Sequence, residues 1–154
     1  MTDTRVSTHV DAAPEHCWRL VSDITNMGRW SPETYHTRWV DGGSPQPGNR
    51  FKGWNRRGPL RWSTVCVIDE ADCPRRFTFT VEHWNRRMTT WSYHFQGESG
   101  GTRMTETRTS LATFRPFQLV TTVIQRGRPF DYPAAMAKTL ERIRVAAEAV
   151  PGAS

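Results

Sequence analysis

The chain has 154 residues, 36% of them hydrophobic and 23% charged, which suits one folded domain and excludes an intrinsically disordered protein. Its net charge of +6 comes mostly from arginines, whose pairs at 56–57, 75–76 and 86–87 are scattered beside turn signals, a distribution that favours solvated turns over a nucleic-acid surface. The three cysteines form no C-x-x-C pair and no apolar run nears the ~20 residues of a membrane span, which argues against a disulfide framework, a structural zinc site and a transmembrane helix.

The first predicted elements are a strand and two short helices. Residues 5–10 alternate between apolar and polar side chains, as a half-buried strand does. Residues 11–15 then have the features of a helix start, with Pro14 suited to the first turn. A second helical segment, 24–30, should end before Pro32. No apolar signal-peptide segment precedes the first strand, so we expect a cytoplasmic protein with a single domain, residues 1–154.

From residue 34 onward the period of the hydrophobic pattern changes to two, and turn residues punctuate the sequence at short intervals. The predicted strands are Thr34–Val40, Asn49–Arg56, Leu60–Asp69, Arg76–His83, Met88–Gln96 and Thr102–Leu111. Because short turns between successive strands require antiparallel neighbours, the sequence predicts an antiparallel meander.

Two helices are predicted after the strands. The first, 115–125, has apolar residues at helical spacing that suit a lid over a pocket, a dimer contact or plain core, and Gly127-Arg128-Pro129 ends it. The second begins near Asp131 and stops before Pro151. Its apolar face comprises Met136, Leu140, Ile143 and Ala147. One amphipathic helix and one half-apolar sheet must cover each other, because neither buries its face alone.

Several motifs make the chain resemble a known superfamily over nearly its whole length, from Val6 to about Ala149. They include Gly28-Arg29-Trp30-Ser31-Pro32, Asn55-Arg56-Arg57-Gly58-Pro59-Leu60-Arg61-Trp62 and Trp91-Ser92-Tyr93-His94-Phe95. With these motifs the sequence resembles the SRPBCC, or START/polyketide-cyclase-like, superfamily, which shares the birch-pollen-allergen fold. The resemblance implies an α+β helix-grip fold, in which a curved seven-stranded antiparallel sheet (β-α-α-β6-α) wraps a long C-terminal helix. It also implies an apolar cavity that takes lipids, sterols, polyketides or other aromatic molecules.

The residues that the pattern aims at this cavity, most of them aromatic or apolar, are the candidate ligand contacts. The set is Trp30, Phe51, Asn55, Trp62, Phe79, Trp91, Tyr93, Phe95, Met104, Glu106, Met136 and Leu140. For any single member, simple core packing is an equally good interpretation.

Three polar members of this set are candidates for catalysis. Alternation aims Asn55 and Glu106 inward, where they could orient a ligand hydroxyl or transfer a proton, and Tyr93 could donate its phenolic proton. The alternative is that Glu106 pairs with Arg103, Arg108 or a loop arginine at the rim of the sheet. The histidines lack metal-ligand spacing and no phosphate-binding loop is present, so we predict neither a metal nor a cofactor.

Three functions remain as hypotheses. The first is the binding of a small hydrophobic molecule by a protein that could form a homodimer. The second is an aromatase/cyclase-type reaction on a polyketide, with Glu106, Tyr93 or Asn55 transferring protons. The third, nucleic-acid binding through the arginines, is not expected because the basic pairs are scattered.

Overall fold

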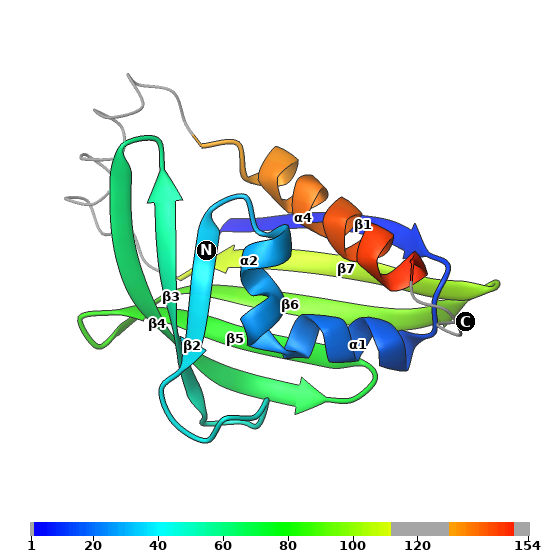
Figure 1. The fold of residues 1–154 in the computed structure, drawn as a ribbon, viewed down its shortest axis with the longest axis horizontal. Helices are drawn as coiled ribbons and strands as arrows, with labels where there is room; N and C mark the ends of the chain where they lie inside the picture. The colour runs from blue at the N-terminus through cyan, green and yellow to red at the C-terminus, as the bar shows by residue number, and fades with distance from the viewer. Residues whose placement is uncertain (1, 112–129, 150–154) are drawn as a thin grey trace.

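A single seven-stranded antiparallel sheet forms the framework of the computed structural model, which describes residues 2–111 and 130–149 (Figure 1). The strand order is β1-β7-β6-β5-β4-β3-β2. The strands are β1 (Thr2–Val10), β2 (Thr34–Trp39), β3 (Arg50–Arg57), β4 (Leu60–Asp72), β5 (Arg76–His83), β6 (Arg86–Glu98) and β7 (Gly101–Ser110). The predicted meander is confirmed, and β1 joins it by pairing with β7.

The helices form one layer over a single face of this sheet. In Figure 1 this layer lies in front of the strands. They are α1 (Pro14–Ser22), the 3-10 helix η1 (Ile24–Asn26), α2 (Met27–Trp30) and the long α4 (Tyr132–Glu148). The predicted C-terminal helix is confirmed. The Asp131 side chain caps it by accepting a hydrogen bond from the Ala134 backbone N–H at 2.9 Å. The helix-grip α+β fold expected from the sequence is therefore the observed fold.

The segment between α1 and β2 is less regular than predicted. Residues 24–30 form a 3-10 turn followed by a single α-helical turn rather than one helix. Gly28 allows this turn to lie against β2, because a Cβ atom there would come within 2.7 Å of the Tyr35 carbonyl oxygen. The turn is also tied to α4, since the Arg142 guanidinium donates a hydrogen bond to the Trp30 carbonyl oxygen at 3.3 Å.

Several strand boundaries differ from the prediction by one to three residues. The β4 strand continues to Asp72, and β6 begins at Arg86 rather than at Met88. The gap predicted between His83 and Met88 is too long, because Trp84 and Asn85 alone form the hairpin turn, with positive φ angles of 50° and 59°. The ladder can therefore begin directly after Asn85.

The core lies where α1 and the C-terminal half of α4 meet the sheet. Ile143 and Ala147 of α4 are fully buried, as are Cys17 of α1 and Phe77 of β5. Trp18 fixes α1 to the sheet, because its indole N–H donates a hydrogen bond to the Arg76 carbonyl oxygen at 2.9 Å. This end of the molecule is therefore filled with side chains.

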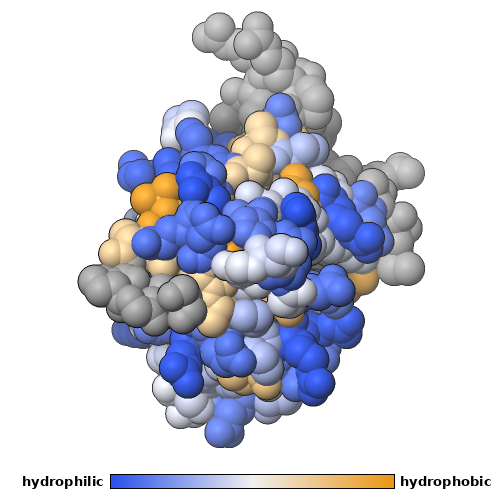
Figure 2. All heavy atoms as spheres, turned by 90° about the vertical axis from the view of Figure 1, so that its right-hand side faces the viewer, coloured by the Kyte–Doolittle hydropathy of each residue, from blue (hydrophilic) through white to orange (hydrophobic). Residues whose placement is uncertain are grey.

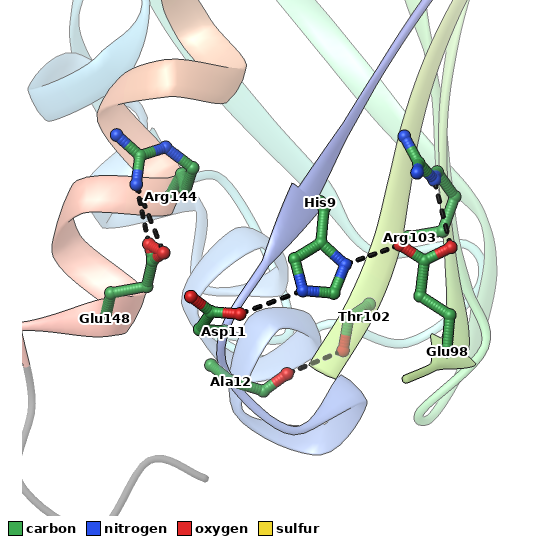
Figure 3. Close-up of polar contacts among 8 residues, drawn as sticks. All are labelled: His9, Asp11, Ala12, Glu98, Thr102, Arg103, Arg144 and Glu148. Carbon is green, nitrogen blue, oxygen red and sulfur yellow. Dashed lines mark hydrogen bonds and ion pairs between the residues drawn. The ribbon is translucent and has the colours of Figure 1, made fainter. Parts of the chain in front are cut away.

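The outer surface of that filled end is closed by polar contacts. Figure 2, which views the molecule from this end, shows a largely hydrophilic surface with only scattered hydrophobic residues. In Figure 3 the His9 ring lies between two carboxylates, 2.9 Å from Asp11 and 2.5 Å from Glu98. Hydrogen bonds to Glu98 and Asp11 raise the pKa of His9 above its ordinary 6.5. Thr102 adds a buried hydrogen bond to the Ala12 carbonyl oxygen at 2.7 Å.

The predicted helix at 115–125, with its possible roles as lid, dimer contact or core, lies outside the described residues. None of the helices in the described part of the chain is long and apolar enough to cross a membrane.

Candidate functional site

The opposite half of the sheet and the first turns of α4 enclose a cavity of about 550 Å³. Its walls come from the inner faces of β3 to β7, from α2 and from the segment that leads into α4. Aromatic side chains dominate these walls: Trp30, Phe51, Trp62, Phe79, Trp91, Tyr93, Phe130 and Tyr132. Phe51 and Phe79 meet edge to face, with ring centroids 5.2 Å apart. A cavity of this size and lining suits a small ring-containing molecule.

Most of the residues predicted to touch a ligand do line this cavity. They are Trp30, Phe51, Asn55, Trp62, Phe79, Trp91, Tyr93, Glu106 and Met136. Phe95, Met104 and Leu140 do not; they belong to the buried core at the filled end. The alternation that aimed Phe95 and Met104 at the inner face of the sheet was right. Alternation along a strand does not predict, however, that α1 and α4 cover this part of the face.

Glu106 is the most unusual residue of the cavity wall. Only 2% of its surface is exposed, and one carboxyl oxygen, Oε2, has no hydrogen-bond partner in the described part of the chain. The Tyr93 hydroxyl, directly opposite on β6, donates a hydrogen bond to the carboxyl group. Burial raises the pKa of Glu106 to about 8, although the bond from Tyr93 partly counters this. At neutral pH the carboxyl group is therefore protonated and able to donate a hydrogen bond or a proton into the cavity.

The described residues do not show the alternative role predicted for Glu106, which was an ion pair at the rim of the sheet. Arg103 pairs with Glu98 at 3.2 Å on the outer side. Arg108 forms no ion pair with Glu106 within residues 2–111 and 130–149, although the two lie on the same face of β7. Among residues 2–111 and 130–149, Glu106 thus has no cationic partner, and its carboxyl group lines the cavity.

Asn55 is also buried in the cavity wall, but its amide already has partners. The Thr34 hydroxyl donates to its Oδ1 at 2.6 Å, and its Nδ2 donates to the Thr64 hydroxyl at 3.3 Å. Three strands separate β3, which carries Asn55, from β7, which carries Glu106. The structure therefore pairs Glu106 with Tyr93 and assigns Asn55 to a separate hydrogen-bonded group.

At the start of α4, two arginines and two aromatic rings form a cluster that the sequence analysis did not identify. Arg57 pairs with Glu33 at 2.6 Å and lies 3.8 Å from the centroid of the Phe130 ring. It also donates a hydrogen bond to the Tyr132 hydroxyl at 3.3 Å. The guanidinium of Arg108 lies 3.7 Å from the centroid of the same Tyr132 ring. This cluster makes one end of the cavity polar and cationic.

A signal for these two arginines was present in the sequence. The alternation that aims Asn55 inward on β3 also aims Arg57 inward, and the one that aims Glu106 inward on β7 continues to Arg108. Tyr132 had no such signal, because its contact with Arg108 depends on how α4 is placed over the sheet. In the described part of the chain no three His, Cys, Asp or Glu side chains gather as metal ligands do.

The chain is similar to a known protein family and to several solved structures. The model of the family described as polyketide cyclase / dehydrase and lipid transport matches residues 1–148. Protein CV1439 from Chromobacterium violaceum superposes with a TM-score of 0.69 at 11% identity, over 97% of this chain and 100% of that one. The Polyketide_cyc-like protein Cgl2372 from Corynebacterium glutamicum gives 0.62 at 23% identity, over 92% and 88%.

The di-domain ARO/CYC BexL from the BE-7585A biosynthetic pathway is also similar, with a TM-score of 0.66 at 16% identity. The match covers 94% of this chain and 46% of BexL. No curated protein matches the sequence. At these identities the solved structures demonstrate a shared fold alone.

Proposed function

Since the chain belongs to the polyketide cyclase / dehydrase and lipid transport family, we propose that it binds a small hydrophobic molecule of lipid, polyketide or aromatic type. The molecule occupies the cavity between the sheet and α4. The observation that carries this proposal is the cavity of about 550 Å³, lined largely by aromatic side chains although the core beside it is tightly filled.

The chemistry of the walls supports a ligand with a ring and at least one polar atom. Ring contacts such as those offered by Phe51, Phe79 and Trp62 favour a flat apolar body. Glu106 is protonated at neutral pH, and its carboxyl group can donate a hydrogen bond to a ligand oxygen. Specificity in such cavities comes from a few polar groups of this kind.

Probe binding to paired tryptophan variants tests the proposal. Pyrenebutanol is an uncharged apolar fluorophore, and energy transfer from tryptophan reports its binding. Trp62 lines the cavity, so Trp62→Ala should weaken binding by roughly tenfold, as expected for loss of a large aromatic contact. Trp54 neighbours the outer-face cations Arg38 and Lys52 and does not line the cavity, so Trp54→Ala serves as the matched control. Equal binding by both folded variants and the wild type would contradict the assigned site.

Glu106 favours a second candidate function, an aromatase/cyclase-type reaction. In such a reaction an enolate carbon attacks a carbonyl carbon, and the carbonyl oxygen must take up a proton. A protonated carboxyl group with a free oxygen in an apolar wall is suited to supply that proton. The hydrogen bonds of Asn55 to Thr34 and Thr64 make it the weaker candidate for proton transfer.

Turnover separates this candidate from binding alone. A linear poly-β-ketone thioester is incubated with the wild type, with Glu106→Gln and with Glu98→Gln, a control at the filled end. If the protein is a cyclase, the wild type and the control should release cyclised product. The turnover rate of Glu106→Gln should be at least 100-fold lower than that of the wild type. Absence of product from the wild type, with pyrenebutanol still bound, would leave binding as the function.

A further inference from the structure

The charges on the cavity wall do not balance. Its acidic and basic side chains are Glu33, Arg57, Glu106 and Arg108, together with the imidazole of His83. Glu33 neutralises Arg57 through their 2.6 Å contact. Glu106 is protonated at neutral pH because burial raises its pKa to about 8. The guanidinium of Arg108 is paired with no carboxylate among the described residues, so this part of the wall is positive.

In the described part of the chain, an aromatic ring holds the Arg108 side chain in position, and no carboxylate pairs with it. It lies on the inner face of β7 and its guanidinium lies over the Tyr132 ring at 3.7 Å. Its Nε atom is buried and has no hydrogen-bond partner among residues 2–111 and 130–149. A guanidinium that rests on an aromatic ring keeps its N–H groups available at its edge, where a planar oxyanion can accept two of them. A buried donor left without an acceptor is costly, which favours an acceptor supplied by a ligand.

No carboxylate side chain of the protein is available to neutralise Arg108. Within residues 2–111 and 130–149 it takes part in no ion pair. Residues 112–129 contain neither aspartate nor glutamate. Arg57, on the same cavity wall, differs because its charge is paired with Glu33, although its Nε, like that of Arg108, has no hydrogen-bond partner among the described residues.

We propose that the ligand is an amphipathic organic anion: its carboxylate pairs with Arg108, and its ring body lies against the apolar wall around Phe51 and Phe79. This inference rests on the proposed function and narrows it to one chemical class. Tyr132 acts as the positioning residue, since its ring supports Arg108 and its hydroxyl accepts the hydrogen bond from Arg57. Glu106, which is neutral and nearby on the same strand, does not repel the anion.

Two pyrene probes that differ only in their polar end test the proposal. Pyrenebutyrate carries a carboxylate, and pyrenebutanol carries a hydroxyl group. The wild type should bind pyrenebutyrate at least tenfold more tightly, as expected of a charge-assisted pair in a partly desolvated site. Arg108→Gln should remove this preference, so that the variant binds the two probes with similar affinity. Arg108→Lys should keep part of the preference, because it retains the charge and loses the planar fork.

Arg5→Gln is the matched control, because Arg5 lies exposed on the neighbouring strand β1 and the substitution changes the net charge equally. Its preference for pyrenebutyrate should equal that of the wild type. Equal wild-type affinity for the two probes would overturn this inference and leave the proposed function standing. Binding of neither probe would overturn both. The comparison within the wild type needs no variant, so misfolding of Arg108→Gln cannot obscure it.

Discussion

At the scale of single residues, Glu106 couples the cavity to the stability of the protein. A carboxyl group in an apolar wall gains less from ionisation than one in water, because it loses the solvation of its charge. The Tyr93 hydroxyl offsets part of that loss, and no residue that the structure describes bonds to Oε2 to offset the rest. A buried carboxyl group that costs stability and makes no structural ion pair is best explained by a role toward the ligand.

Replacing Glu106 should change how stability depends on pH. The pKa of Glu106 is about 8 in the folded protein and near its ordinary 4.5 in the unfolded chain. Between these values the folded state holds a proton that the unfolded state has released, so wild-type stability falls as pH rises from 4.5 to 8. The total fall from this group is roughly 3–5 kcal/mol. In Glu106→Gln it should be absent, as urea unfolding at pH 5, 6, 7 and 8 would measure.

His9 also loses stabilising contacts as pH rises through its raised pKa, but it is present in both proteins and its effect cancels in the comparison. Tyr93→Phe is the matched control for the hydrogen bond. It removes an interaction that lowers the pKa of Glu106, so the fall in stability should extend to higher pH. Equal pH dependence in the wild type and Glu106→Gln would contradict the raised pKa.

At the scale of elements, β3 keeps the cavity open by carrying a glycine between two inward side chains. Gly53 lies between Phe51 and Asn55 on the inner face and lines the cavity. A Cβ atom there would meet its nearest neighbour, a methyl group of Thr34, at 3.7 Å, which is an ordinary contact. The strand could therefore carry a larger side chain at this position, and that side chain would occupy ligand space.

Gly53→Val should block the cavity without unfolding the protein. Valine suits a strand and reduces the freedom of the unfolded chain, so stability should be unchanged or raised by about 0.5–1 kcal/mol. Pyrenebutanol binding should weaken by roughly tenfold or more, because the new methyl groups exclude part of a ring. Gly97→Val is the matched control: Gly97 is a strand glycine at the filled end, with its nearest Cβ neighbour 4.0 Å away. Retained probe binding by Gly53→Val would contradict the location of the site.

The strands and their faces were the part of this architecture that could be predicted from sequence. Alternation identified the inward residues of β5 and β6, because one face of each strand is apolar. The hairpin turn at Trp84 and Asn85 was misplaced because tryptophan rarely adopts a positive φ angle, although Asn85 suits one.

The site was predictable only where it depends on alternation. Glu106 could be aimed inward from its own strand, but its partner Tyr93 follows from the register between β6 and β7, which depends on the exact turn that joins these strands. The same holds for Arg108, whose contact with Tyr132 joins β7 to a helix that begins more than twenty residues later in the chain. Contacts of this kind depend on tertiary packing.

At the scale of the whole molecule, α4 divides between two tasks. Its C-terminal half, with Ile143 and Ala147, packs into the filled core. Its N-terminal half, with Ala135, Met136 and Thr139, lines the cavity. A bound molecule therefore replaces, in one half of the protein, the packing that side chains provide in the other. Ligand binding and the stability of the helix on the sheet should be thermodynamically linked.

A bound probe should accordingly stabilise the entire domain. At a free concentration 100 times its dissociation constant, a ligand that binds only the folded state adds about 2.7 kcal/mol. For a chain of this length we expect a rise in Tm of roughly 5–10 °C, measured by calorimetry with pyrenebutyrate. Gly53→Val should show about half of this rise or less at the same probe concentration, whereas Gly97→Val should match the wild type. An equal rise in Gly53→Val would mean that the probe binds elsewhere, because only a ligand inside the cavity contacts both the sheet and α4 through the space that valine fills.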